Sequence, residues 1–396
     1  MAGWGFVAPT ARQVVHALLR GCGLAALLVL AGSGAAAAKQ APVRLRPALQ
    51  AAVEAAAADS AVPGALMHVS APRLGLEWGG AAGVADRQSG ALLTPGHAVR
   101  LASNTKTYTA AAALRLWEQG RLDLEAELDS LLPAEYLELL RQGGYDPEAI
   151  TPRHLLTHTS GLFDYATADA FLAEVLAEPQ RRWTRLEQVR GAMQWGKPYG
   201  RPGAVFHYSD TGYVLLGLII ERRTDRGLGP ALRGLLDYDG LGLRATWLER
   251  LEEGPAGVPR AHQYYGDLDT YGFDPSFDLY GGGGLVATMG ELAAFMRALG
   301  RGEVFAQAAT LETMLAPVMV GGMPGTHEYR MGLSVTRVAG YRAYVHRGFW
   351  GTAAAYFPDL DASVALSVNQ GESDRLWPLL EAAAAAVGSA TLSGSF

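Results

Sequence analysis

A serine and a lysine three residues apart define the chemistry that this chain can perform. Ser103 and Lys106 lie in RLASNTKTYTAAAA, and the residues that follow predict a helix over 105–118. Residues three apart share one face of a helix, so the Lys106 amine can reach the Ser103 hydroxyl. A serine attacks a carbonyl well only if a neighbour takes its proton, which a neutral lysine can do. The pair therefore predicts a nucleophile with its base, beside helix N-terminal N–H groups that can hold an oxyanion.

The scarcity of lysine supports the catalytic interpretation of this pair. The chain contains only three lysines, Lys39, Lys106 and Lys197. Arginine cannot be deprotonated in a protein, so a base at this position has to be lysine. The alternative is that Ser103 only caps the helix and Lys106 is a surface residue of its first turn.

Two further segments carry side chains that can move protons or bind a substrate. Tyr208 directly precedes an apolar helix predicted over 210–224, and a phenol beside a lysine can pass a proton to a leaving group. His346 ends a predicted strand and can give a substrate a hydrogen bond or a charge. Gly348 follows, where a missing side chain lets a substrate backbone approach closely. A half-buried tyrosine and a structural strand histidine are the alternatives for the first two residues.

Other motifs are incomplete. His154 and His158 have the spacing of metal ligands on a helix, but Leu155 stands where the metalloprotease motif needs glutamate. We interpret both histidines as packing and capping residues. The glycines at 281–284 lack the Gly-Lys-Ser/Thr that completes a phosphate-binding loop, and the chain has no Gly-x-Ser-x-Gly elbow. The sequence thus predicts no metal site and no cofactor.

The first 38 residues have the pattern of a secretory signal. Arg12 and Arg20 precede an apolar run at 24–31, and small residues follow up to Ala38. The run is short for a membrane span, so we expect cleavage near Ala38, no stable membrane span afterwards, and a periplasmic or secreted protein.

Cleavage at this point changes the charge and the cysteine content. Residues 1–38 contain two arginines and no acidic residue, so the formal charge would go from −6 to −8. This balance argues against nucleic-acid binding. Cys22, the only cysteine, would leave with the signal, and the mature chain could then form no disulfide.

Hydrophobic periodicity predicts strands at both ends of the chain and helices between them. We therefore expect an α/β fold in which one mainly antiparallel sheet, built from 39–98 and 321–396, is flanked by N- and C-terminal helices. A mostly helical domain, 99–320, would carry Ser103 and Tyr208, with the site between the two. The expected elements are a helix over 47–58, a hairpin of 65–70 and 74–78, helical segments within 122–140 and 168–193, helices over 210–224 and 292–299, strands over 329–338, 341–347, 353–357 and 362–368, and a helix over 373–387.

Together the three motifs resemble those of the serine β-lactamase and penicillin-binding-protein superfamily, in its class C-like branch. SNTK at 103–106 resembles Ser-x-x-Lys, YSD at 208–210 resembles Tyr-x-Asn, and HRG at 346–348 resembles Lys-Thr-Gly or His-x-Gly. The likeness covers roughly 47–385. It implies the β-lactamase/transpeptidase-like fold and an acyl intermediate on Ser103. It also implies that Lys106 and Tyr208 move the proton and that the N–H groups of Ser103 and Phe349 hold the oxyanion.

Two departures from the family pattern bear on the substrate. Asp210 replaces the usual asparagine, and a carboxylate facing Lys106 would raise the lysine pKa and leave more of the proton transfer to Tyr208. His346 replaces a lysine that helps to hold a substrate carboxylate, and histidine is mostly neutral at pH 7. Arg347 is a candidate to replace this charge, although the alternation of side chains along a strand points it the other way.

These departures favour an esterase or a peptidase over an efficient β-lactamase. We expect a serine hydrolase of esters or D-amino-acid peptides, of the carboxylesterase or D-Ala-D-Ala carboxypeptidase/aminopeptidase type. β-Lactamase activity is the alternative within this class. A non-hydrolytic penicillin-binding sensor is the alternative of another class, and its support is Asp210. The expected partners are small-molecule or peptide substrates, namely an ester, a D-amino-acid peptide or a β-lactam.

Overall fold

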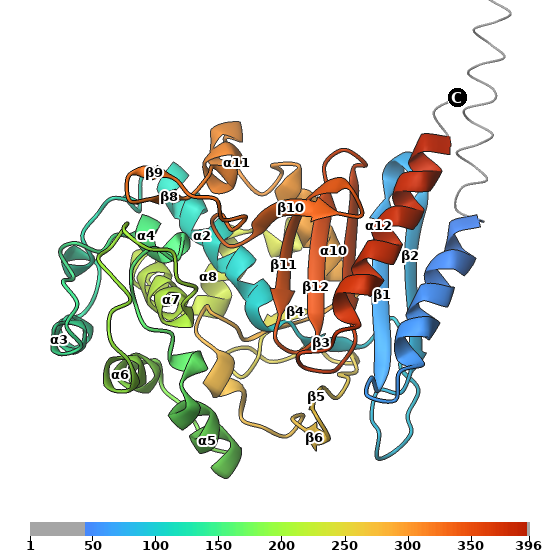
Figure 1. The fold of residues 1–396 in the computed structure, drawn as a ribbon, viewed down its shortest axis with the longest axis horizontal. Coiled ribbons are helices and arrows are strands. Elements are labelled where there is room, and N and C mark those ends of the chain that lie inside the picture. Colours follow the sequence, from blue (N-terminus) through green and yellow to red (C-terminus); the bar gives the residue numbers. More distant parts are fainter. Residues whose placement is uncertain (1–43, 394–396) are drawn as a thin grey trace, which may run out of the picture.

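One six-stranded antiparallel sheet joins the two ends of the chain. The computed structural model describes residues 44–393, so the predicted signal lies outside the described residues. The first two strands pair with the last four, because β1 lies beside β13 (Figure 1). The sheet predicted to be completed by both termini is therefore confirmed. Its order is β10 (Ser334–Val338), β11 (Tyr341–Gly348), β12 (Thr352–Phe357), β13 (Ala362–Ser367), β1 (Gly64–Ala71) and β2 (Leu76–Gly83).

Two strand boundaries differ from the prediction by more than two residues. β2 continues through Gly79 and Gly80, which we expected to lie beyond the strand; a Cβ on Gly80 would lie 2.3 Å from the Trp78 ring, so glycine permits the strand here. β10 begins at Ser334 rather than at 329, because Gly332 has a φ of +75° that interrupts the extended backbone.

Helices cover both faces of the sheet. The helix at 44–57 and α12 (Leu376–Ser393) pack their apolar side chains on one face, and α10 (Met289–Gly300) packs on the other (Figure 1). The N- and C-terminal helices are thus confirmed, although α12 starts three residues later than predicted and runs further. Within the described part of the chain, no helix has the length and apolar character needed to cross a membrane.

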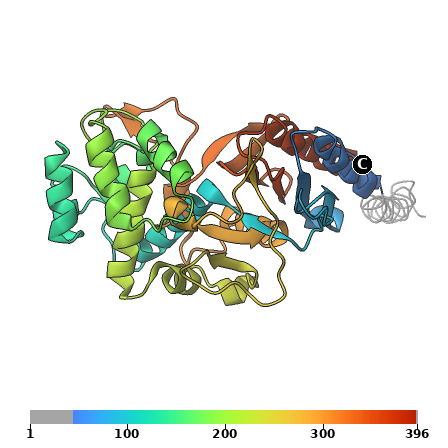
Figure 2. The same ribbon diagram turned by 90° about the horizontal axis from the view of Figure 1, so that it is seen from below.

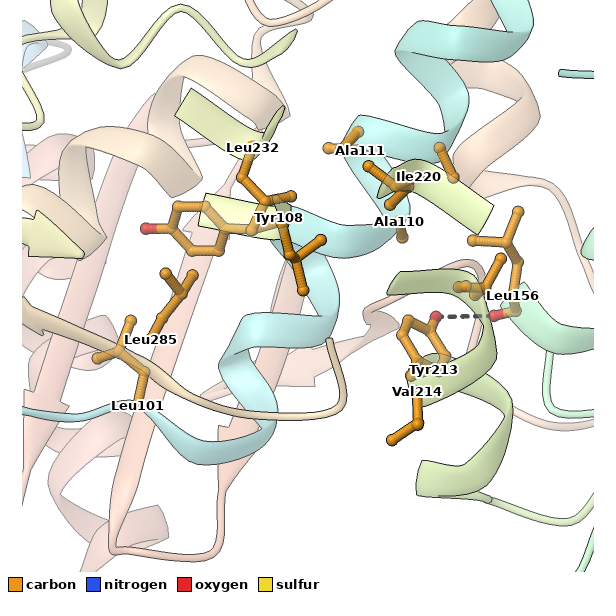
Figure 3. Close-up of a cluster of buried hydrophobic side chains, with 14 of the residues drawn as sticks. Leu101, Tyr108, Ala110, Ala111, Leu156, Tyr213, Val214, Ile220, Leu232 and Leu285 are labelled. Atoms are coloured by element: carbon orange, nitrogen blue, oxygen red, sulfur yellow. Dashed lines mark hydrogen bonds between the residues drawn. The ribbon is translucent and has the colours of Figure 1, made fainter. Parts of the chain in front are cut away.

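The helix α2 (Thr105–Glu118) lies at the centre of the helical part and has the predicted bounds. Its alanines are fully buried, which lets α7 (Asp210–Thr224) and α8 (Leu228–Leu235) pack closely against it (Figure 3). Tyr108 stacks on Phe295 with 3.5 Å between ring centroids, and the Tyr213 hydroxyl donates to the Leu156 carbonyl at 2.9 Å. This packing fixes the helix that carries Lys106.

The rest of the helical part consists of short elements beside the main sheet (Figure 2). A small sheet in the order β3-β7-β4, from three- and four-residue strands, was not predicted. The boundaries proposed for the two domains stay a prediction. The remaining elements are β3 (Ala98–Arg100), β4 (Thr246–Leu248), β5 (Tyr264–Tyr265), β6 (Leu268–Asp269), β7 (Leu285–Thr288), β8 (Met319–Val320), β9 (Met323–Pro324), α3 (Ala134–Gln142), α4 (Pro152–Leu156), α5 (Asp169–Ala177), α6 (Arg185–Trp195), α9 (Tyr238–Leu241) and α11 (Ala308–Leu315), with 3-10 turns η1 (Pro72–Leu74), η2 (Ala102–Asn104), η3 (Leu128–Ser130), η4 (Tyr165–Thr167) and η5 (Pro275–Asp278).

A threonine caps the start of both α4 and α10. Thr151 caps α4, and His154 completes the box by accepting from the Thr151 N–H, so His154 has the predicted capping role. Thr288 caps α10 by accepting from the Glu291 N–H at 3.4 Å. The Glu291 carboxylate accepts from the N–H groups of Arg244 and Ala245.

Gly332→Ala is expected to destabilise the protein by about 3 kcal/mol or more. Its φ of +75° disfavours any side chain, and a Cβ would lie 2.5 Å from Ala110 Cβ and 2.7 Å from the Lys106 carbonyl. Gly340→Ala is the matched control, because Gly340 has a φ of +86° and open space around it. The control should cost only about 1 to 2 kcal/mol. Equal losses in urea unfolding would contradict the steric argument.

Candidate active site

A strained residue and several hydrogen bonds fix the backbone that presents Ser103. The chain leaves β3, and Ala102 adopts a φ of +46°, which is unfavourable for an alanine and is typical of functional sites. The Leu101 carbonyl accepts from Asn104 Nδ2 at 3.1 Å and from the Thr352 hydroxyl at 3.0 Å. These bonds tie the turn η2 to strand β12, so Ser103 lies between the helical part and the main sheet.

Lys106 is buried and makes three polar contacts. Its Nζ donates to Ser103 Oγ at 2.8 Å and to the Gly282 carbonyl at 2.8 Å, and it forms an ion pair with Asp210. Three acceptors match the three donors of an ammonium group. Burial lowers the lysine pKa, but the attraction of Asp210 and of Tyr208 outweighs it and the net shift of the pKa is upward. The Asp210 carboxylate therefore faces Lys106 and raises the lysine pKa, as expected from the second motif.

Tyr208 is the third polar side chain of this group. Its side chain faces Ser103 and Lys106, with Lys106 Nζ 4.9 Å from the ring centroid. Burial, opposed by Lys106 and reinforced by Asp210, raises the pKa of Tyr208 to about 12, so the phenol is protonated at neutral pH. The ring of buried His158 supports it at 4.1 Å between centroids, which is the packing role predicted for that histidine.

The next residue along the chain holds this support in place. The Ser209 N–H donates to His158 Nδ1 at 3.1 Å, so the backbone that follows Tyr208 is attached to the same histidine. Burial, with the charge of Lys106, holds the pKa of His158 well below its usual range, and the ring is therefore a neutral packing surface.

The third motif presents a neutral histidine. His346 Nδ1 lies 2.8 Å from the Arg347 carbonyl, so this nitrogen carries the proton and Nε2 does not. Burial and the nearby Lys106 charge lower the pKa of His346 to about 3. The guanidinium of Arg347 lies 5.6 Å from the Trp377 ring, and both residues line the same polar groove as Ser103 and His346. His346 therefore does not supply the fixed positive charge of a third-motif lysine, and Arg347 is the residue of this groove lining that carries one.

Glycine is required at position 348 because the end of β11 approaches the backbone of Leu101 closely. A Cβ at this position would lie 2.2 Å from the Leu101 carbonyl and 2.3 Å from Thr352 Oγ. The glycine therefore lets the end of β11 meet the turn that carries Ser103. Phe349 follows at the start of the next turn, where its side chain is exposed and lines the same hollow as Ser103.

Ser103 lies where two hollows meet. One is an apolar cavity of about 150 Å³, lined by α5, by the 265–278 segment and by Phe349 and Trp350. The other is a wider polar groove of about 600 Å³, lined by Tyr208, Tyr329 and His346. A carbonyl compound can therefore place an apolar group on one side of Ser103 and a polar group on the other.

Sequence reasoning missed three residues of the site. Gly282 provides an acceptor for Lys106, and the run of four glycines was a signal of close backbone approach. Asp164 and Asp278 are two further carboxyl groups near Asp210. Burial, with repulsion from Asp210, raises the pKa of each to about 7. No local motif marks these two residues, since Asp164 caps the short 3-10 turn η4 and Asp278 ends the short 3-10 turn η5.

One group of side chains within 44–393 has the spacing of metal ligands, namely Asp86, His262 and Asp269. His262 Nδ1 lies 2.6 Å from Asp269 Oδ2, and the ring stacks on Tyr271. Each carboxylate also accepts a backbone N–H, from Gln88 and Tyr271. An ion pair and turn hydrogen bonds account for this group, and we assign it no metal.

Lys106 is expected to remain protonated above pH 10.4, the ordinary lysine value. Removing the carboxylate in Asp210→Asn leaves burial dominant, so the pKa of Lys106 should fall by more than one unit. NMR of protein labelled with [¹³C]lysine measures this directly, because the chain has only three lysines and Lys197 is exposed. A wild-type Lys106 that titrates below pH 10.4, or an unchanged pKa in the variant, would contradict the ion-pair argument.

The fold and the Ser–Lys–Tyr arrangement define a serine hydrolase of the β-lactamase and penicillin-binding-protein type. The sequence profile of the Beta-lactamase family matches residues 49–389, and the chain belongs to this family. The resemblance inferred from the three motifs is thus confirmed.

Solved structures agree over most of the chain. A D-stereospecific amidohydrolase from Streptomyces sp. is 30% identical, with a TM-score of 0.71, over 84% of this chain and 97% of that one. D-amino acid amidase from Ochrobactrum anthropi SV3, complexed with L-phenylalanine amide, is 24% identical, with a TM-score of 0.73, over 87% and 99% of the two chains. The β-lactamase/transpeptidase-like fold is therefore confirmed.

Curated relatives match over a shorter stretch. Protein flp of Staphylococcus aureus (strain N315) is 34% identical over 125 residues, which are 31% of this chain and 23% of that protein. The aligned part of this chain thus spans about a quarter of the length of the curated relatives it matches.

Proposed function

We propose that the chain is a serine hydrolase that acylates Ser103 with an ester or a D-amino-acid amide or peptide and releases the acyl group to water. The observation that carries this proposal is the 2.8 Å contact between Ser103 Oγ and Lys106 Nζ, with Tyr208 facing both. The Streptomyces amidohydrolase supports it, since its name describes D-stereospecific amide hydrolysis and it is 30% identical. The signal-like pattern of residues 1–38 supports a periplasmic or secreted enzyme.

Tyr208 carries the proton in this proposal. Lys106 is held as an ammonium by its three acceptors, so it stabilises charge in the resting site instead of accepting a proton. As Ser103 Oγ bonds to the substrate carbonyl carbon, its proton passes to the Tyr208 oxygen in concert with transfer of the Tyr208 proton to the leaving nitrogen or oxygen, so the phenol stays neutral while the C–N or C–O bond breaks. Water then attacks the acyl-serine by the reverse path, which restores the Ser103 hydroxyl. The N–H groups of Ser103 and Phe349 hold the oxyanion in both steps.

The neutral imidazole of His346 favours substrates without a carboxylate beside this residue. A β-lactam or a D-Ala terminus presents a carboxylate, and His346 offers it no positive charge because its pKa is about 3. The apolar cavity beside Ser103 instead favours an acyl group with an apolar substituent. Esters and amides therefore fit the site better than β-lactams do.

Initial rates on matched substrates test this proposal. We expect kcat/KM for a short-chain p-nitrophenyl ester or a D-amino-acid amide to exceed that for a chromogenic cephalosporin by about 100-fold or more. Faster turnover of the cephalosporin would make the protein a β-lactamase. Acylation by a penicillin with no release of product from any substrate would make it a sensor.

A further inference from the structure

The apolar cavity beside the nucleophile contains a carboxyl group that the acyl-transfer chemistry does not use. Asp278 ends the 3-10 turn η5 and lines the cavity together with Ser103 and Asp210. Its carboxyl group lies against the backbone of Gly283, where a Cβ would come within 1.9 Å of Oδ1. The cavity is otherwise lined mainly by aromatic and aliphatic side chains, so an acidic group in its wall requires an explanation.

Positive charge is scarce around this carboxyl group. Lys106 is paired with Asp210, so its charge is already matched. Arg100 is bound to Glu249 at 2.7 Å and to two carbonyls, which uses its charge elsewhere. The indole of Trp350 is the polar side chain that faces Asp278, and it is neutral. The excess negative charge of this wall is therefore available to a cation that enters the cavity.

Asp164 does not provide the same opportunity. It is 2% exposed, and its Oδ1 accepts from the N–H groups of Ala166 and Asp210, both at 3.1 Å. These bonds show that Asp164 holds the start of α7 against the turn η4. Asp278 is only partly buried, and it reaches the cavity surface. Of the two carboxyl groups with raised pKa values, Asp278 is thus the one that a substrate can contact.

The size and the rim of the cavity indicate the group that accompanies the cation. Its volume of about 150 Å³ is close to that of an engineered cavity of roughly 150 Å³ that binds benzene. Leu172, Leu176, Leu268 and Phe349 surround the opening, and each is more than 40% exposed. Large exposed apolar side chains gathered at one opening mark a binding surface for apolar groups.

We propose that Asp278 binds the protonated α-amino group of the substrate, while a phenyl-sized side chain fills the cavity and the carbonyl lies at Ser103. The preferred substrates would then be amides, esters or peptides of amino acids that have a free amino group and a bulky apolar side chain. This inference rests on the proposed serine hydrolase function, which it narrows to a substrate class. Asp278 acts in specificity and takes no part in proton transfer.

The test compares two substrates that differ only in the amino group. Phenylalanine p-nitroanilide, as the D and the L enantiomer, carries an α-ammonium group, and 3-phenylpropionyl p-nitroanilide does not. Asp278→Asn keeps the shape of the side chain and removes its charge. We expect the variant to lose about tenfold or more in kcat/KM for the preferred enantiomer, the size of a charged hydrogen bond, and less than about twofold for the analogue. Asp267→Asn, at an exposed carboxylate of the neighbouring hairpin, is the control and should change neither value.

The wild-type enzyme provides a second measurement that does not depend on a folded variant. The pKa of Asp278 is raised to about 7, so its carboxyl group is protonated below this pH and charged above it. KM for the ammonium substrate should therefore fall as the pH rises from 6 to 7, a range in which its α-amino group is still largely protonated, whereas KM for the analogue should not. Burial and the negative charge of Asp210 raise this pKa, whereas the positive charges of Lys106 and Arg100 lower it.

The outcomes separate this inference from the function on which it rests. Equal losses for both substrates in Asp278→Asn, or parallel pH profiles in the wild type, would overturn the amine-binding role and leave the hydrolase intact. Faster wild-type turnover of the analogue than of either enantiomer would also overturn it. Absence of wild-type activity on every ester and amide would refute the proposed function itself.

Discussion

Ser103→Ala is expected to lower kcat by about 10⁴-fold or more on every substrate that the wild type cleaves. The change removes the only atom that can form the acyl bond in the proposed mechanism. It removes one hydrogen bond to Lys106, whose contacts with Gly282 and Asp210 remain. The fold should therefore be retained, with a melting temperature within a few degrees of the wild type.

Two measurements check this expectation. The initial rates of wild type and variant give the loss of kcat, and intact-mass spectrometry shows whether a substrate adds to the protein. Ser70→Ala, at a buried serine of β1 in the sheet, is a control for loss of a serine hydroxyl and should keep full activity. A Ser103→Ala protein with more than a few per cent of wild-type activity would show that another group is the nucleophile.

Tyr208→Phe is expected to lower kcat by about 10² to 10⁴-fold, the range for loss of a general acid or base. The hydroxyl faces both Ser103 and Lys106. Among the described residues that line the polar groove, Tyr329 is the other tyrosine, and its hydroxyl is directed to Tyr213. The ring should keep its place, since it packs on His158 at 4.1 Å. KM should change less than kcat, because the proton is transferred only in the transition state.

Tyr213→Phe is the matched control for this change. Its hydroxyl is buried in the same group of side chains and donates to the Leu156 carbonyl at 2.9 Å (Figure 3). Its loss should cost about 1 kcal/mol of stability and less than about threefold in kcat. If the two variants lose activity equally, the Tyr208 hydroxyl is structural and Lys106 has to be the base.

The positions of the main helices and strands were predictable from local patterns. The buried alanines after Ser103 and the apolar run after Asp210 have clear helical periodicity, and both helices have the expected bounds. The C-terminal strands alternate with short turns, which sets their antiparallel pairing. The short strands of the small sheet have no periodicity of their own, and they depend on pairing with distant segments.

The candidate site was predictable where its residues lie in motifs and was not where they lie in loops. The Ser103–Lys106 contact follows from helix geometry, and the Asp210 ion pair follows from the second motif once that motif lies beside the first. Asp278 could not be found in this way, because it reaches the cavity from a loop that runs far from Ser103 in the sequence. Substrate specificity therefore depends on tertiary packing of loops that local patterns do not determine.

Time-resolved intact-mass spectrometry of the wild-type protein with a p-nitrophenyl ester tests whether Ser103 is the nucleophile. We expect an acyl adduct within the turnover time, located on Ser103 by peptide mapping, that decays as the acid product is released. Product release with an adduct on another residue, or with no adduct at Ser103 when the reaction is quenched in acid during turnover, would contradict it.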